Sequence, residues 1–333
     1  MTSREQQLSA WLGNVLGIAA PAIAPASSDA SFRQYFRVAV DDYTLIVMDA
    51  PPAHENCEPF IHTARVFADA GLNVPRVLEQ DLQQGFLLLS DLGNTTYLAA
   101  MQNGGVDVNA LYRDAYLALV KMQLASRQGE LPDYDEALLT REMQLFPDWY
   151  VARHLQVDLS SEQQQSLQAT FDLLNRNILE QPQVYVHRDY HSRNLMVCES
   201  NPGILDFQDA VFGAITYDLV SLLKDAYVKW EEEQILDYAV RYWQAAKKAG
   251  LPVAEDFADF YRDFEWMGVQ RHLKVLGIFA RLYHRDGKDG YLKDMPLVMH
   301  YLYTACTRYR ELRPLVKLLD QLQGKQPVVG YTF

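Results

Sequence analysis

The stretch V-Y-V-H-R-D-Y-H-S-R-N-L-M-V, from Val184 to Val197, holds the strongest chemical signal in this chain. It places two histidines, two arginines, one aspartate and one asparagine between two apolar runs. A chain that needed only a turn at this point would use glycine, proline or asparagine. These residues therefore predict a polar loop with a chemical task, flanked by a short strand on each side.

The residues that follow this loop predict a hairpin. Residues 195–197 and 204–205 have strand character, and E-S-N-P-G between them is turn chemistry. Paired strands lie about 5 Å apart, so Asn194 and Asp206 should lie roughly opposite each other at the open end of the hairpin. Asp189 stands five residues before Asn194 in the same loop. Three oxygen-bearing side chains that converge in this way suit a hard cation such as Mg²⁺.

The loop and the hairpin together resemble a known pattern. His187-Arg188-Asp189-x-x-x-x-Asn194, followed by I-L-D-F with Asp206, resembles the catalytic and metal-binding motifs of the kinase-like fold. The resemblance implies that Asp189 takes the proton from a substrate hydroxyl, and that Asn194 and Asp206 hold Mg²⁺ on the phosphates of ATP. The alternative is a chance match, which the flanking strands and the second aspartate make rarer.

His191 and the spacing to the next aspartate indicate the type of kinase. Protein kinases usually have lysine at this position, whereas aminoglycoside phosphotransferases and choline kinases favour His-x-Asp-x-His-x-x-Asn. Twelve positions separate Asp206 from Asp218, which leaves no room for a segment that would hold a peptide. G-A-I-T-Y-D-L, residues 213–219, matches the Gly-x-x-x-x-Asp-Leu pattern of aminoglycoside phosphotransferases. That resemblance implies that Asp218 braces the catalytic loop from the start of a helix.

The bulk composition is typical of a globular protein with one large domain or two lobes. The chain has 333 residues, of which 49% are hydrophobic. Its net charge of -13 argues against nucleic-acid binding, which needs a basic face. Cys57, Cys198 and Cys306 form neither a disulfide framework nor a zinc pattern, so we expect ordinary thiols in a reducing compartment.

The N-terminal segment favours an amphipathic helix over a signal peptide. Leu8, Trp11 and Leu12 have helical spacing ahead of the apolar residues 15–26, and Glu5 breaks a positively charged leader region. No apolar run approaches the ~20 residues of a membrane span. We therefore expect a cytoplasmic protein with neither a membrane nor a nucleic acid as partner.

The first ninety residues predict a small sheet with helices. Asp41-Asp42 predicts the turn of a β-hairpin, and Pro59 opens a helix that Gly71 ends. Residues 74–78 and 85–89 have strand character.

Beyond residue 93 the chain is mainly helical. Helical periodicity covers residues 109–125, 160–180, 216–229, 231–249, 254–284 and 295–323. We predict an α+β protein-kinase-like bilobal fold of the aminoglycoside phosphotransferase type. A small β-rich nucleotide-binding lobe, residues 1–93, precedes a larger helical lobe, residues 94–333, which holds the catalytic loop and the sugar site.

The first lobe departs from the kinase pattern where phosphates are normally covered. S-S-D-A-S-F-R-Q-Y-F-R-V, residues 27–38, contains no glycine. Its small residues, Ser28 and Ser31 among them, would still let backbone N–H groups approach phosphates. Met48 or Asp49 stands where a strand of the kinase-like fold carries a phosphate-binding lysine.

Two arginines are candidates to replace this lysine. Arg33 is the first candidate and Arg37 the second; the alternative is that both are solvated strand residues. Glu58 matches the glutamate that normally pairs with the lysine by position only. F-L-L-L-S-D-L-G, residues 86–93, resembles the hinge segment of kinases, so the backbone at Asp91 and Leu92 is expected to meet adenine, although its leucines also suit a core.

Several stretches together resemble a narrower group. They are D-A-S-F-R-Q-Y-F-R-V, L-I-V-M-D-A-P-P, I-L-D-F-Q-D-A-V-F-G and M-G-V-Q-R-H-L-K-V-L-G-I-F-A-R-L. They are similar to the bacterial anomeric N-acetylmuramate/N-acetylglucosamine kinases, a branch of the aminoglycoside phosphotransferase-like family, from about residue 25 to the C-terminus. The resemblance implies ATP-dependent phosphorylation of the anomeric hydroxyl of an amino sugar in peptidoglycan recycling.

The sugar site is less defined by the sequence. Arg271, Lys274 and Arg281 share one helix face loosely and would suit the lactyl carboxylate of N-acetylmuramate, unless they form a solvated basic face. A polycationic aminoglycoside would instead need acids, of which the chain offers Glu255, Asp256, Asp259, Asp263 and Glu265.

Two other functions remain open. The chain would be an aminoglycoside or other small-molecule kinase, or a pseudokinase that only binds nucleotide. The glycine-free loop and the missing lysine motivate the pseudokinase, whereas Asp189, Asn194 and Asp206 argue against it.

Overall fold

The computed structural model describes residues 3–19, 21–28 and 32–324, which form two compact units. Within these residues, unit 1 consists of 3–122 and 193–210, and unit 2 consists of 123–192 and 211–324. The three cysteines are free thiols, as expected. Among the described helices, none combines the length and the apolar character that a membrane crossing needs.

The compact units differ from the division expected at residue 93. Residues 94–122 and 193–210 belong to unit 1. Asn201 joins these two segments, because its side-chain amide donates to the Tyr97 hydroxyl at 2.8 Å and to the Asp114 carboxylate at 3.0 Å. The assignment of residues 1–93 to nucleotide binding and of the remainder to the sugar stays a prediction.

Unit 1 is built on a five-stranded antiparallel sheet, which confirms the predicted small sheet and adds a strand, the first, that the sequence did not indicate. Its strand order is β1-β2-β3-β5-β4. The hairpin between the second and third strands turns at Asp41, as predicted. The strands are β1 (Ile23–Ser28), β2 (Gln34–Val40), β3 (Tyr43–Asp49), β4 (Val77–Asp81) and β5 (Phe86–Ser90).

The helices of unit 1 include the predicted helix at Pro59. This is α2 (Glu58–Asp69), which Ala70 caps, and Gly71 follows with φ 76°. Glycine adopts this left-handed conformation without the cost of a Cβ. The other elements are α3 (Tyr97–Asn103), α4 (Val108–Leu124), whose last residues lie in unit 2, and the hairpin strands β7 (Leu195–Met196) and β8 (Gly203–Ile204).

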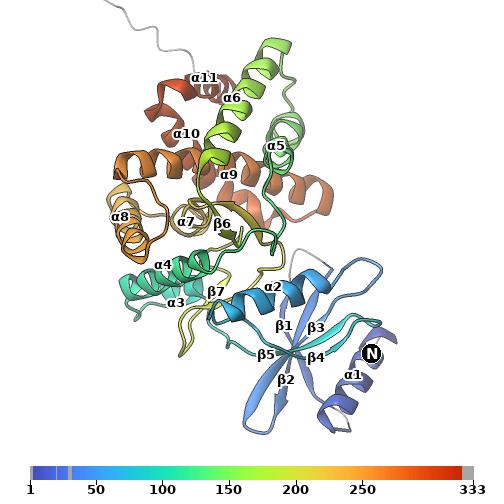
Figure 1. Cartoon of the computed structure of the whole chain (residues 1–333). Helices are drawn as coiled ribbons and strands as arrows, with labels where there is room; N and C mark the ends of the chain where they lie inside the picture. Colours follow the sequence, from blue (N-terminus) through green and yellow to red (C-terminus); the bar gives the residue numbers. More distant parts are fainter. Residues whose placement is uncertain (1–2, 20, 29–31, 325–333) are drawn as a thin grey trace, which may run out of the picture. The chain divides into compact units, whose positions relative to one another are not determined.

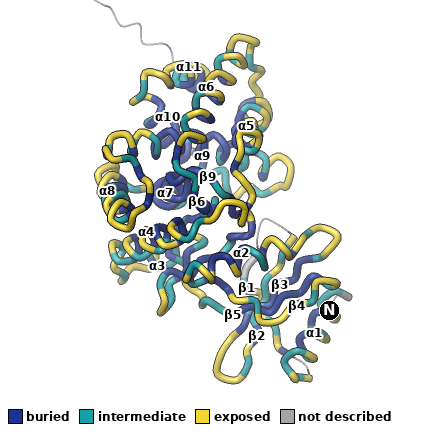
Figure 2. The backbone as a smooth tube through the Cα atoms, in the orientation of Figure 1, coloured by how far each residue is buried: buried dark blue, intermediate teal, exposed yellow. Residues whose placement is uncertain are grey.

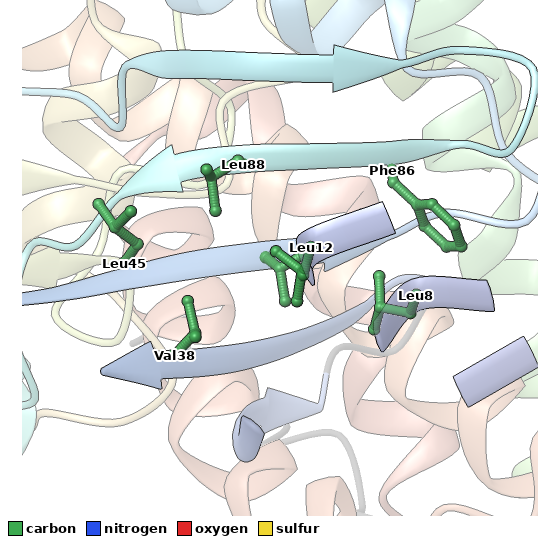
Figure 3. Packing of buried hydrophobic residues seen from close by; sticks show 7 residues of the cluster. Leu8, Leu12, Val38, Leu45, Phe86 and Leu88 are labelled. Carbon is green, nitrogen blue, oxygen red and sulfur yellow. The ribbon is translucent and has the colours of Figure 1, made fainter. Parts of the chain in front are cut away.

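The predicted amphipathic helix is α1 (Ser3–Leu16), and it packs on the sheet. Leu8 and Leu12, one helical turn apart, lie in a cluster with Val38 and Phe86 (Figure 3). Both leucines are at most 1% exposed, and full burial of each contributes about 1.5–3 kcal/mol. From the same helix, the Arg4 guanidinium lies 4.3 Å from the centroid of the Phe86 ring.

Unit 2 is organised around the long helix α9 (Phe257–Asp286). Its middle turns are buried, and the tube of Figure 2 is dark blue there. It contacts other helices of the unit, and Figure 1 shows it running between them. They are α5 (Glu136–Met143), α6 (Ser161–Glu180), α7 (Tyr217–Leu223), α8 (Glu232–Ala249), α10 (Met295–Arg308), the π-helix η1 (Phe146–His154) and the short 3₁₀ helix η2 (Asp289–Asp294).

Gly277 sets how closely η1 approaches α9. A Cβ at Gly277 would lie 2.4 Å from the carbonyl carbon of Leu145, the residue that precedes η1. Every other residue at this position would push the two backbones apart. The close approach also brings Glu142, three residues before Leu145, alongside Lys274, three residues before Gly277.

Two predicted helices are interrupted. Residues 295–323 form α10, the 3₁₀ turn η3 (Arg310–Leu312) and α11 (Arg313–Leu322), because Pro314 lacks the N–H that a continuous helix needs. The helix expected at 216–229 ends at Leu223, and the Asp225 carboxylate then accepts the N–H groups of Tyr227 and Val228 instead of a helical carbonyl. The sequence patterns did not predict β1, α3, α5, η1, η2 or β9 (Val211–Ala214).

Candidate active site

The polar loop follows a buried strand in unit 2. This strand, β6 (Gln183–Val186), pairs antiparallel with β9, and Val186 lies opposite Val211. The pair positions the loop because His187 and Arg188 come directly after its last residue.

Asp218 braces the loop, as the resemblance implied. It lies buried in the first turn of α7. Its Oδ2 accepts the N–H of His187 at 2.6 Å and its Oδ1 accepts the N–H of Arg188 at 3.0 Å. Arg188 has φ 76°, a conformation that strains a residue other than glycine, and these two bonds hold it there. Burial nevertheless raises the pKa of Asp218 to about 7.

Asp189 stands next on the loop and remains accessible. Its side chain is 43% exposed, and its Oδ1 lies 3.6 Å from Nη2 of Arg271. Desolvation acts to raise its pKa, but the positive charges of Arg271, Lys274, His191 and Arg188 hold that pKa well below the usual range. Asp189 is therefore a carboxylate at neutral pH.

Arg271 and Lys274 are buried beside the loop and do not form a solvated basic face. Nη1 of Arg271 donates to the Arg188 carbonyl at 2.7 Å and to the Tyr217 hydroxyl at 3.1 Å. Nζ of Lys274 donates to the same hydroxyl at 3.1 Å. Arg281, the third member of the predicted set, lies near Arg285 and Asp286 at the end of α9, and the neighbouring Arg285 charge adds to burial in lowering its pKa.

Glu142 on α5 completes this cluster, and sequence reasoning missed it. Its carboxylate is 2.9 Å from Nζ of Lys274, and it also accepts hydrogen bonds from the Arg188 guanidinium and the Tyr134 hydroxyl. Burial acts to raise the pKa of Glu142, but Lys274 and Arg188 hold it below its usual value. The sequence does contain a signal for this short helix: Asp135 is a typical N-cap residue and directly precedes E-A-L-L-T-R-E-M.

In unit 1 the predicted hairpin brings Asn194 and Asp206 together. Leu195 pairs with Ile204, and Leu205 donates its N–H to the Asn194 carbonyl at 2.9 Å. Nδ2 of Asn194 then lies 3.2 Å from Oδ2 of Asp206, which has φ 63°. The sequence therefore predicted this contact.

Gln208 is a third polar residue at the hairpin that the sequence did not indicate. Its Nε2 donates to Oδ1 of Asp206 at 2.7 Å. Its Oε1 is buried and has no hydrogen-bond partner within the described part of the chain. A buried acceptor of this kind is a candidate ligand atom for a cation or its bound water.

The donor set at the hairpin suits magnesium. It consists of one carboxylate and two side-chain amides, all with hard oxygen atoms, which fits an ion that binds one or two carboxylates and keeps several waters. In residues 3–19, 21–28 and 32–324, no three histidine, cysteine, aspartate or glutamate side chains gather into a group that would hold a metal.

Arg33 is paired with an acid that the sequence had not singled out. Its Nε lies 3.0 Å from Oε2 of Glu55, and Oε1 of Glu55 accepts the N–H of Phe32 at 3.0 Å. The two paired side chains are only 12% and 10% exposed, so Arg33 is not a solvated strand residue. Glu58, matched by position, is exposed instead.

Arg37, the second candidate, forms an ion pair with Asp91. Its guanidinium binds both carboxylate oxygens of Asp91, at 2.5 and 3.0 Å, and donates to the Gly93 carbonyl at 2.9 Å. The carbonyl of Leu92 accepts the thiol of Cys198 at 3.2 Å. An adenine contact at Asp91 and Leu92 stays a prediction.

Two further predicted positions fall at the edge of the described structure. Ser28 is the last residue of β1, and Ser31 lies outside the described residues. Leu87–Leu89 form part of the buried core, as their alternative interpretation predicted.

Phe207, the residue after Asp206, packs against α2. Its ring centroid lies 4.9 Å from that of Phe60 and 5.9 Å from that of Phe67. The start of α2, close to Glu55, and the Asp206 backbone are therefore parts of one packed body within unit 1.

The sheet of unit 1, the braced aspartate loop and the asparagine–aspartate pair define a phosphotransferase with the protein-kinase-like fold. The chain is similar in structure to a spectinomycin phosphotransferase in complex with ADP and spectinomycin, with a TM-score of 0.63, 12% identity and coverage of 90% of this chain and 98% of that one. The model of the family described as "Phosphotransferase enzyme family" matches residues 22–261, and the chain belongs to this family.

Two curated relatives match nearly the whole chain. One is the N-acetylmuramate/N-acetylglucosamine kinase of Pseudomonas aeruginosa, 52% identical, with 97% of this chain and 98% of the relative covered. The other carries the same name in Neisseria meningitidis serogroup B and is 49% identical, with 99% of each chain covered.

Proposed function

We propose that this protein is an ATP-dependent kinase of the anomeric (C1) hydroxyl of N-acetylmuramate and N-acetylglucosamine, acting in peptidoglycan recycling. The similarity to curated kinases of these sugars over nearly the full length supports the substrate. The observation that carries the reaction is an accessible carboxylate, Asp189, which the buried cations Arg271 and Lys274 keep ionised.

Asp189 serves to orient the acceptor hydroxyl. Because its pKa is held low, it is a weak base. A hemiacetal hydroxyl is more acidic than the other sugar hydroxyls and releases its proton more readily to such a carboxylate. Phosphoryl transfer has a loose transition state and depends mainly on positioning. Asp189 therefore accepts the hydrogen bond of the C1 hydroxyl and directs its oxygen to the γ-phosphate at ~3–3.5 Å.

In this proposal, residues of unit 1 bind the nucleotide and its metal ion. Asp206 and Asn194 would hold Mg²⁺, and Gln208 orients the Asp206 carboxylate. When bound, this ion would supply positive charge that neutralises the phosphates. Arg33, held by Glu55, replaces the missing lysine in contacting the phosphates.

The remaining contacts in this proposal come from backbone atoms and from the buried cations. Backbone groups near Ser28 meet the phosphates, and those at Asp91 and Leu92 meet adenine. Arg271 and Lys274 act on the acceptor through the Asp189 loop, which they support directly.

The acidic residues that would suit an aminoglycoside are engaged within the protein. Lys247 pairs with Glu255, Asp256 caps α9, and Asp263 accepts the Asn177 amide at 2.8 Å. Glu265 is buried and accepts hydrogen bonds from Arg308 and Tyr309. Glu255 and Asp259 are still exposed at the surface, so the preference for an amino sugar rests on the similarity to the curated kinases.

Regiochemistry tests the proposal. N-acetylglucosamine and N-acetylmuramate should give phosphorylated products without a free reducing end, which phosphorus-coupled NMR reports directly. Their methyl 1-glycosides have no C1 hydroxyl and should accept no phosphoryl group. Efficient phosphorylation of a methyl glycoside, or a product that still reduces, would assign another hydroxyl. Turnover of an aminoglycoside alone would assign the alternative substrate class.

A further inference from the structure

The irregular segment from Asp225 to Glu231, between α7 and α8, is hydrogen-bonded to the catalytic loop at Ser192. Oδ2 of Asp225 accepts the Ser192 hydroxyl at 2.6 Å and the Ser192 N–H at 3.3 Å. Oδ1 accepts the N–H groups of Tyr227 at 2.9 Å and of Val228 at 2.7 Å. Asp225 is only 2% exposed, so four hydrogen bonds satisfy a buried carboxylate and fix the start of the segment.

Tyr301 of α10 holds the same segment further along. Its hydroxyl donates to the Val228 carbonyl at 3.3 Å and accepts the Trp230 N–H at 3.4 Å. A segment without helix or strand hydrogen bonds is therefore anchored at both halves by side chains from the surrounding protein. Its backbone is therefore preorganised, which lowers the entropic cost of binding a ligand.

Tyr227 lies beside the catalytic loop. Its ring centroid is 5.3 Å from that of His191, at an interplanar angle of 77°. The backbone N–H of His191 donates to the backbone carbonyl of Asp189 at 3.0 Å. Tyr227 is partly exposed, as is Asp189. Within unit 2, the Tyr227 ring therefore contacts His191, and His191 is hydrogen-bonded to Asp189, whose carboxylate is proposed to orient the acceptor hydroxyl.

We propose that this segment forms a wall of the acceptor subsite, with Tyr227 as the platform on which the C–H face of a pyranose packs. The inference rests on the proposed function and names residues for its sugar. A tyrosine ring offers a large apolar face at a small entropic cost, and ligand sites combine such faces with a few placed polar groups. Asp225 is the positioning residue, because it holds Tyr227 and Ser192 in one arrangement.

The first test compares Tyr227→Ala with Tyr227→Phe in the full chain. Loss of the ring should raise the KM for N-acetylglucosamine about two- to tenfold, as for one aromatic contact, and leave the KM for ATP unaltered. Phenylalanine keeps the ring and should restore the sugar KM to within about twofold. Tyr283→Ala, which removes an aromatic side chain 39% exposed on α9, is the matched control and should not change the sugar KM.

The second test separates positioning from stability. Asp225→Asn keeps the size of the side chain but removes acceptor capacity, so it should raise the sugar KM and lower kcat while the KM for ATP stays constant. A purely structural role would lower the melting temperature without this split between substrates.

The outcomes distinguish two failures. Wild-type turnover of the amino sugars together with an unaltered sugar KM in Tyr227→Ala would overturn the subsite alone. If the wild-type protein neither phosphorylates N-acetylglucosamine nor binds its methyl 1-glycoside in calorimetry, the subsite and the proposed function fall together.

Discussion

Asp189 in unit 2 and Asp206 in unit 1 are the same residue type, but the hydrogen bonds and charges described around them differ. Asp189 lies among the charges of Arg188, Arg271 and Lys274, which hold its pKa low. Asp206 accepts hydrogen bonds from the neutral amides of Asn194 and Gln208. The protein thus supplies fixed positive charge to one carboxylate and neutral donors to the other.

This difference matches the charges of the ligands in the proposed reaction. A sugar hydroxyl carries no charge, so the positive charges that favour the ionised form of Asp189 come from the protein itself. A nucleotide arrives with Mg²⁺, and a carboxylate that lies beside two side-chain amides offers that ion hard oxygen ligands. The following predictions test whether the two aspartates have these separate tasks.

Asp189→Asn should have the largest effect. It keeps the shape but cannot accept a proton, and kcat should fall by roughly 10²–10⁴-fold. Binding of ADP, measured by calorimetry, should persist because the change lies in unit 2. Turnover close to that of the wild type would remove Asp189 from the mechanism.

Asp206→Ala should act on the nucleotide instead. Loss of a metal-binding carboxylate removes several kcal/mol of charge stabilisation, so Mg²⁺-dependent nucleotide affinity should fall by roughly 10³-fold. Titration with a nucleotide analogue, with and without Mg²⁺, measures this effect. Equal affinity of variant and wild type for the Mg²⁺ complex would contradict the metal assignment.

Asp218 provides a contrast within unit 2, because its pKa is shifted upwards to about 7. An unfolded aspartate titrates near pH ~3.9, so between the two values the native protein keeps a proton that the unfolded chain has lost. The free energy of unfolding should therefore fall as the pH rises from about 4 to 7 and then level off, with up to about a 10³-fold change in the unfolding constant.

Asp218→Asn is the control for this pH dependence. The variant has no proton to release at this position, so its unfolding free energy should change less over the same pH range in urea titrations. Asp189, whose pKa is depressed, contributes in the opposite sense and only at acidic pH, where stability is lost as the pH falls. An unaltered slope in Asp218→Asn would assign the dependence to another group.

Gln208→Ala tests whether the amide that binds the Asp206 carboxylate contributes to metal binding in unit 1. Residues that orient a metal ligand typically contribute 10–100-fold in affinity, so the apparent affinity for Mg²⁺ should weaken by about that factor. Gln84→Ala is a matched control, because Gln84 donates in the same way to a carboxylate of unit 1, that of Asp81. Equal losses in both variants would indicate a general effect on unit 1.

Arg33→Ala should have the smallest effect. A charged hydrogen bond contributes about 1.5–3 kcal/mol, and solvent screening reduces this, so the KM for ATP should rise by roughly tenfold or less. Glu55→Gln, which removes the partner charge and keeps Arg33, should shift the same KM by a smaller factor. A rise in the sugar KM alone would contradict the nucleotide role of Arg33.

The parts of the site that depend on neighbouring residues could be predicted from the sequence. Asn194 and Asp206 flank a short hairpin, and the strand and turn preferences of the intervening residues determine that they meet. The same applies to the Asp41 turn and to the helix at Pro59. The His-x-Asp spacing and the Gly-x-x-x-x-Asp-Leu pattern led to the correct family.

The pairings between distant residues were decided by the tertiary structure alone. The ion pair of Glu142 with Lys274 depends on how α5 and η1 approach α9 at Gly277, and the pair of Arg33 with Glu55 joins residues 22 positions apart in the sequence. Such contacts produce no recognisable pattern in the sequence, because each partner is a single polar residue in a helix or loop that otherwise looks typical. The sequence by itself determined the chemical groups and their local geometry; the packing of helices determined which charges surround them, since electrostatic effects depend on distance and burial in three dimensions.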